Sequence, residues 1–187
     1  KERQNLDILT NYANTGLMNV GFFAAKKYGK FGYTFTGLFN SQKAFDVDDD
    51  DFSELPKSQE FTFNPKLFFY FSENSRLILG NSFTTGKRTG GDMNVISVKA
   101  DNFHQYFEKN TSIRNNSTLE FGHQFDQTSS INLRAAFSVF DREIAIPAYD
   151  FKGWSKNFYS DFSWNKNLKK YTLHKNYTKC SVFTLWR

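Results

Sequence analysis

The sequence predicts an all-β protein: an antiparallel up-and-down meander of about eight long strands that forms a partial transmembrane β-barrel wall. Three observations predict this class: strict alternation of apolar and polar residues, runs of about ten residues or more, and connections that alternate in length. Strands of globular proteins average ~5–6 residues, so the expected strands are longer than typical globular ones. Aromatic residues make up 19% of the 187 residues, a composition that favours strands over helices.

The clearest strand is 60–71, EFTFNPKLFFYF. Its odd-numbered residues from Phe61 to Phe71 are aromatic, Leu or Pro, whereas Thr62, Asn64 and Lys66 fall on the other parity. Successive side chains of a strand point to opposite faces, so one face of this strand is almost wholly apolar. In chain order, the alternation predicts strands at 17–27, 31–45, 60–71, 76–85, 112–125, 130–140 and 155–164, and an eighth that starts at Tyr171.

The connections fall into two groups. Tight turns are expected at 28–31, 72–75, 126–129 and 165–170, and longer segments at 46–58, 86–110 and 141–153. An up-and-down sheet returns to the same end after every second connection. The turns should therefore lie at one end and the long segments at the other, and outer-membrane barrels keep their long loops on the outside.

The second face of the expected strands is polar. In a transmembrane barrel, an aromatic outer face meets outer-membrane lipid and a polar inner face meets a wet lumen. Lys66, Glu120 and Arg134 are the charges that we expect in the lumen. The other polar residues on this face are Thr34, Thr36, Asn40, Thr62, Asn64, Ser82, Thr84, Thr118, Gln124, Asn132 and Ser138.

Composition and motifs argue against several functional classes. Net charge is +5, but Lys and Arg are scattered and form no basic stripe, so no nucleic-acid partner is expected. Cys180 is the one cysteine, which excludes a disulfide framework within the chain. His104, His123 and His174 lack the spacing of metal ligands. Because no nucleophile–base constellation appears either, we expect no enzyme and no cofactor.

Several loose motifs carry a more specific resemblance. Residues 64–96, NPKLFFYFSENSRLILGNSFTTGKRTGGDMNVI, combine a proline-containing strand start, a short turn, a returning strand and a glycine-rich segment. Residues 104–121 and 137–164 continue the pattern. In order and spacing, this chain resembles the barrel of TonB-dependent outer-membrane receptors of the Bacteroidetes type over roughly residues 12–172.

The resemblance implies active uptake of a scarce nutrient, such as an iron chelate, cobalamin or an oligosaccharide, across the outer membrane of a Gram-negative bacterium. In this family, TonB and a plug domain act together with the barrel. Because no plug-like segment and no terminal barrel signal is recognised, residues 1–187 are expected to be one internal segment of the barrel. Residues 174–187 lose the alternation and form a doubtful tail.

Substrate contacts of such a segment should come from the long loops. The acidic run from Asp46 to Glu54 lacks the spacing and the glycine of an EF-hand loop, so we expect a solvated surface loop and no metal site. The candidate substrate-binding residues are Asp48, Asp49, Asp50, Asp51, Lys87, Arg88, Asp92, Tyr106 and Tyr149.

Two alternatives remain open. One is a self-contained eight-stranded outer-membrane barrel with a structural or adhesive role. The other is a soluble ligand-binding barrel of the lipocalin type, in which the apolar face would point inward around a ligand.

Overall fold

The computed structural model describes residues 4–97, 102–168, 171–175 and 185–186. The chain is all-β, apart from one short helix, α1 (Met93–Ser97), in a loop. The strands are β1 (Asn5–Tyr12), β2 (Met18–Tyr28), β3 (Phe31–Gln42), β4 (Lys57–Ser72), β5 (Ser75–Gly91), β6 (Phe107–Asp126), β7 (Ser129–Ile146), β8 (Tyr149–Leu168), β9 (Tyr171–Lys175) and β10 (Leu185–Trp186).

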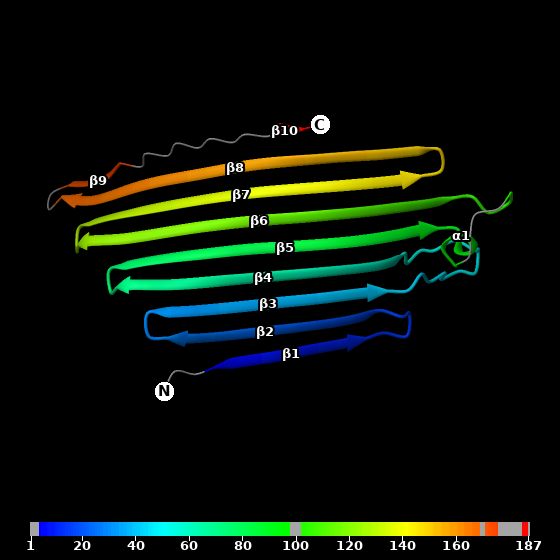
Figure 1. Cartoon of the computed structure of the whole chain (residues 1–187), viewed down its shortest axis with the longest axis horizontal. Helices are drawn as coiled ribbons and strands as arrows, with labels where there is room; N and C mark the ends of the chain where they lie inside the picture. Colours follow the sequence, from blue (N-terminus) through cyan, green and yellow to red (C-terminus); the bar gives the residue numbers. More distant parts are fainter. Residues whose placement is uncertain (1–3, 98–101, 169–170, 176–184, 187) are drawn as a thin grey trace.

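All these strands belong to one antiparallel sheet. From β1 to β8, each strand pairs with its neighbour in sequence, and both β9 and β10 pair with β8 (Figure 1). In the described residues, β1 and β8 are not joined, so the sheet is open. The prediction of an up-and-down meander of long strands is confirmed.

Two of the predicted long segments, 86–110 and 141–153, have the wrong boundaries. The segment 86–110 is not one continuous loop: β5 continues to Gly91 and β6 begins at Phe107, so ten of its 25 residues belong to strands. The segment 141–153 is no loop: β7 and β8 are joined by Pro147 and Ala148 alone, with Ala148 at a positive φ of 63°. Polar residues and glycines suggested loops, but paired neighbours hold them in the ladder.

Two further differences lie at the ends of the meander. Strand β1 was not predicted, although Leu6, Ile8 and Tyr12 alternate with polar residues, because Leu9 interrupts the pattern. The expected turn 165–170 lies largely within β8, which continues to Leu168, and residues 169–170 lie outside the described part. The eighth predicted strand corresponds to β9, and most of the doubtful tail 174–187 also lies outside the described residues.

The grouping of the connections at two ends is confirmed. The turns β2–β3, β4–β5 and β6–β7 lie together at one end (left in Figure 1), which we call the turn end. The loop 43–56, the loop 92–106 with α1 and the turn at Pro147 lie at the other end (right in Figure 1), which we call the loop end.

Strand register divides the side chains into two chemically distinct faces. Phe39 pairs with Phe61, and the odd-numbered residues of β3 to β7 share one face with the even-numbered residues of β1, β2 and β8. We call this the aromatic face and the opposite one the polar face. Every residue expected on the polar side, including Lys66, Glu120 and Arg134, lies on the polar face.

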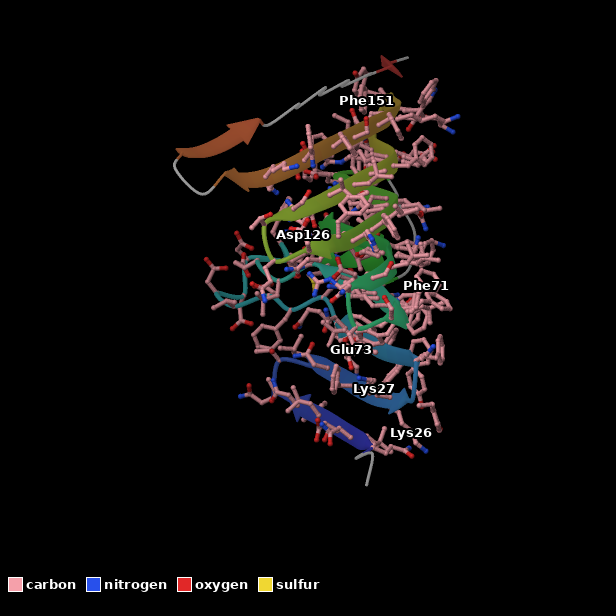
Figure 2. The ribbon with its side chains drawn as sticks, turned by 90° about the vertical axis from the view of Figure 1, so that its left-hand side faces the viewer. Lys26, Lys27, Phe71, Glu73, Asp126 and Phe151 are labelled. Carbon is pink, nitrogen blue, oxygen red and sulfur yellow. The ribbon has the colours of Figure 1, made fainter. Side chains whose placement is uncertain are left out.

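The sheet has no hydrophobic core of its own in the described residues, where no apolar side chain is buried. Figure 2 shows the sheet end-on as a single layer, with Phe71 and Lys26 of the aromatic face on the same side. The aromatic rings pack on one another instead: Tyr33 stacks on Phe35 at 4.7 Å between ring centroids, and Phe35 on Phe63 at 6.1 Å. The two faces therefore suit different surroundings, one apolar and one aqueous.

Candidate functional site

The candidate loop residues gather at the loop end, but in different settings. Asp48 to Asp51 lie in the loop 43–56, and Asp92 and Tyr106 in the loop 92–106. Lys87 and Arg88 are in β5, and Tyr149 is the first residue of β8. Lys87 and Arg88 also point to opposite faces of the sheet, so they cannot act as one loop site.

Asp92 organises the loop that follows β5. Its side chain, 7% exposed, accepts a hydrogen bond from the Asn94 amide at 2.8 Å and pairs with Nδ1 of His104 at 2.7 Å. Its backbone carbonyl accepts a bond from the Ile96 amide in α1. Partial desolvation alone would raise the pKa of Asp92, but the hydrogen bonds from His104 and from backbone amides outweigh it and hold the pKa below the usual value of 3.8. His104 was not predicted to act here, since nothing in the sequence links it with Asp92.

The two loops are tied to each other. Ser53 and Gly91 exchange two bonds, from the Ser53 amide to the Gly91 carbonyl at 2.9 Å and from the Gly91 amide to the Ser53 hydroxyl at 3.0 Å. The Met93 amide donates to the Asp51 carbonyl. Gly91 has a φ of 119°, and a Cβ there would lie 2.6 Å from the Tyr106 carbonyl oxygen, so only glycine fits this junction.

The acidic residues of the loop 43–56 converge. The Asp46 carboxylate accepts hydrogen bonds from the backbone amides of Asp49 and Asp51, and both of these residues have positive φ. The carboxylates of Asp46, Asp48, Asp50 and Glu54 lie within 4.8 Å of one another. Repulsion, mainly from Asp50, raises the pKa of Asp48 above 3.8.

These four carboxylates are the group that could hold a hard cation, among the described residues. Contrary to the sequence analysis, their spacing matches positions 1, 3, 5 and 9 of an EF-hand loop, and Asp51 supplies a positive φ of 67° at the position of its glycine. Position 12, where an EF-hand has a bidentate glutamate, is Lys57. The match is therefore partial.

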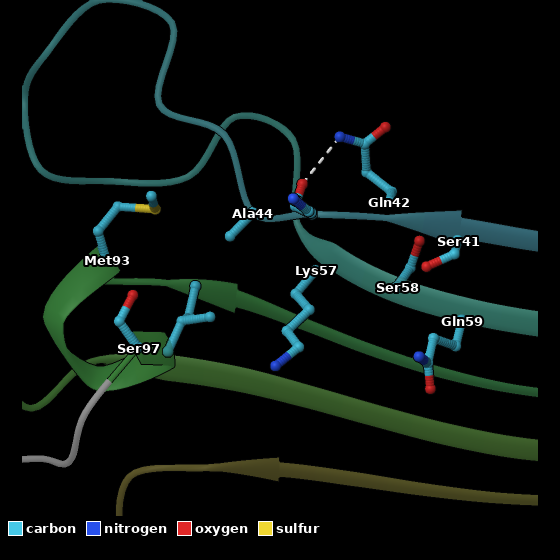
Figure 3. Close-up of a pocket in the computed structure, with 10 residues that line it drawn as sticks. Ser41, Gln42, Ala44, Lys57, Ser58, Gln59, Met93 and Ser97 are labelled. Carbon is cyan, nitrogen blue, oxygen red and sulfur yellow. Dashed lines mark hydrogen bonds between the residues drawn. The ribbon is translucent and has the colours of Figure 1, made fainter. Parts of the chain in front are cut away.

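Helix α1 overhangs the ends of β3 and β4 and encloses a shallow depression of about 390 Å³ (Figure 3). Met93 and Ile96 line one side, and strand residues of both faces line the other: Gln42 and Ser58 of the polar face, and Ser41, Lys57 and Gln59 of the aromatic face. A second depression, of about 310 Å³, follows on the polar face beside it, and a third, of about 400 Å³, lies at the turn end around Arg76 and Asn132. Polar-face residues form most of the lining of the second and third depressions.

The predicted lumen charges lie near the turn end of the polar face. Glu120 of β6 is directly opposite Arg134 of β7, and Arg134 is opposite Asp161 of β8, which the sequence analysis did not single out. Lys66 lies two strands away from Glu120, opposite Gly80. The row therefore alternates in charge across three strands, so each of these charges faces an opposite one, although no ion pair joins them among the described residues.

None of the helices in the described residues is long and apolar enough to span a membrane. No family model, no curated protein and no solved structure matches the chain.

Proposed function

We propose that this chain is part of the wall of a TonB-dependent outer-membrane transporter, which takes up a scarce nutrient such as an iron chelate, cobalamin or an oligosaccharide. The observation that carries the proposal is a single-layered sheet with two chemically distinct faces and no buried apolar side chain in its described residues. Large exposed apolar patches mark surfaces that contact a membrane, another protein or a ligand. Lipid against the aromatic face and water against the polar face would satisfy both.

The length of β8 fits this environment. Trp154 and Trp164 both lie on its aromatic face, with Lys156, Phe158, Ser160 and Phe162 between them on that face. Their separation of ten residues corresponds to about 33 Å along the strand at about 3.3 Å per residue. A strand tilted by about 40° would then place the two indoles about 25 Å apart along the membrane normal, the height of the apolar band between the aromatic girdles of outer-membrane barrels.

A further observation supports a barrel with the polar face inside. Polar-face residues form most of the lining of the depressions of about 310 Å³ and about 400 Å³. A lipocalin-type barrel would instead enclose the aromatic face. The resemblance of residues 64–96, 104–121 and 137–164 to TonB-dependent receptors supports transport rather than adhesion as the role of the barrel.

Spin-label accessibility along β7 tests the membrane orientation. With Cys180 replaced by Ser, single labels at positions 134–139 in membrane-embedded protein should give oxygen accessibility that peaks at 135, 137 and 139. Accessibility to a water-soluble nickel chelate should peak at 134, 136 and 138. Loss of this alternation contradicts the wall, and labels on the aromatic face that neither reagent reaches favour the soluble lipocalin-type barrel. Heat-modifiable migration of the isolated chain after refolding in detergent would favour a self-contained barrel.

A further inference from the structure

Two arginines on the polar face, unlike Arg88 and Arg134, have no carboxylate opposite or diagonal to them on the neighbouring strands. Arg114 of β6 lies opposite Phe140 of β7, and Arg142 is two residues further along β7, opposite Ser112. Residues in this diagonal relation have Cα atoms about 7–8 Å apart, within the combined reach of two arginine side chains.

Both guanidinium groups are held by neutral partners. The Arg142 Nε donates to the Asn110 carboxamide oxygen at 3.2 Å, and the Arg114 guanidinium lies over the Phe140 ring at 4.9 Å. Neither arginine forms an ion pair with a described carboxylate. Their charges are thus oriented but not neutralised.

The surroundings leave room for a ligand. The row of Arg142 continues through Ser112 and Gly86 on one side and Gly153 on the other, so the floor consists of small residues. Gly86 and Ser112 also line the depression of about 310 Å³ beside the arginines.

Two acidic residues face this region, Glu60 in β4 and Glu108 at the start of β6. Glu60 is opposite Gly86, and Glu108 is opposite Gly90, so both flank Arg88 of β5 diagonally. Arg88 is thereby compensated in part. On the polar face of β7 and β8, the nearest carboxylate to the pair is Asp161, which is opposite Arg134 near the turn end.

We propose that Arg114 and Arg142 form a binding site for an anionic solute that carries carboxylate or phosphate groups. Guanidinium groups form strong, charge-assisted hydrogen bonds with both kinds of oxyanion. An anion between the two arginines also relieves the repulsion of like charges on one face. This inference rests on the proposed function, in which the polar face lines an aqueous path, and it adds a substrate class: an anionic nutrient.

Isothermal titration calorimetry on the full chain in detergent micelles tests the site, with inorganic pyrophosphate and succinate as separate probes. Arg114→Gln and Arg142→Gln should each weaken binding by about tenfold or more, the usual effect of losing a charged hydrogen bond. Arg134→Gln is the matched control: it removes the same charge from the same face but from a position opposite two carboxylates, Glu120 and Asp161, and binding should change less than about twofold. Which probe binds more tightly distinguishes phosphate from carboxylate recognition.

Equal weakening by Arg134→Gln, or no heat from either probe with the β-sheet intact by circular dichroism, would overturn the site. If a Gln variant fails to fold, Arg142→Lys keeps the charge without the planar fork and should bind at an intermediate strength. The spin-label experiment separates this outcome from the proposed function. Alternating accessibility with no anion binding removes the site alone, whereas anion binding without alternation removes the membrane wall.

Discussion

An arginine placed on the aromatic face at mid-height should be far more costly than one placed on the adjacent polar position. Phe137 lies on the aromatic face of β7, opposite Phe158. It is four residues from the row of Trp154, marked on β7 by Asp141, and six from the row of Trp164, marked by Ile131. These intervals correspond to about 13 Å and about 20 Å along the strand, so Phe137 lies close to the centre of the expected apolar band.

Phe137→Arg should destabilise the membrane-embedded protein by about 2–4 kcal/mol, the cost of Arg at the midplane of an outer-membrane barrel. Ser138→Arg is the matched control, since Ser138 lies on the polar face between Asn116 and Asn157. It should cost no more than about 0.5 kcal/mol. Ile131→Arg, level with Trp164, should fall between about 0 and 1 kcal/mol.

Urea titration of the protein in phospholipid vesicles, followed by tryptophan fluorescence, measures the three values. A cost for Ser138→Arg equal to that for Phe137→Arg would refute the assignment of lipid to the aromatic face. A flat profile from Phe137 to Ile131 would refute the position of the band.

Three more perturbations have expected outcomes. Gly37→Ala should lower the free energy of unfolding by about 1–3 kcal/mol in the same titration, because the new Cβ would overlap the Phe22 ring. Gly21→Ala is the control and should lower it less, because no atom lies closer than 3.5 Å to a Cβ at that position. Because the pKa of Asp48 is raised in the folded loop, the loop 43–56 gains stability as pH falls towards 4, whereas Asp92, with its lowered pKa, does not contribute in this direction. Proteolysis of this loop should therefore be slower at pH 4 than at pH 7. Asp50→Asn removes the main source of repulsion and should reduce the difference. In an intact receptor that carries this segment, replacing residues 93–105 by a short turn should weaken substrate binding and leave barrel assembly intact. Shortening the turn 72–75 should instead harm assembly. Unchanged substrate affinity and uptake after the loop replacement would contradict recognition at the loop end.

The sequence was sufficient to predict the faces, because alternation with a period of two is a local property that each strand carries by itself. Phe61 to Phe71 and Ile131 to Val139 show it without any knowledge of their neighbours. The outer parts of the strands could not be predicted in this way. Thr85 to Gly91 have polar and glycine-rich composition, and they are extended only because β4 and β6 pair with them on both sides.

The contacts between the two loops at the loop end also could not be predicted from the sequence. The pair of Asp92 and His104 and the exchange of bonds between Ser53 and Gly91 join residues 12 and 38 positions apart. Gly90 and Gly91 are visible in the sequence as a glycine-rich motif, but nothing in the sequence links Gly91 with its partner Ser53. The convergence of Asp46, Asp48, Asp50 and Glu54 does leave a signal, because their spacing matches positions 1, 3, 5 and 9 of an EF-hand loop.

The strict neighbour-to-neighbour order of β1 to β8 has a consequence for how the sheet forms. Each pairing closes a connection between consecutive strands, so no step requires segments distant in the chain to find each other, and loop-closure entropy stays small throughout. Assembly can proceed like a zipper, with every completed hairpin serving as the template for the next strand. The same linear order makes the sheet vulnerable at a single point: a strand that fails to pair would separate the strands before it from those after it, and each part would keep its own internal ladder.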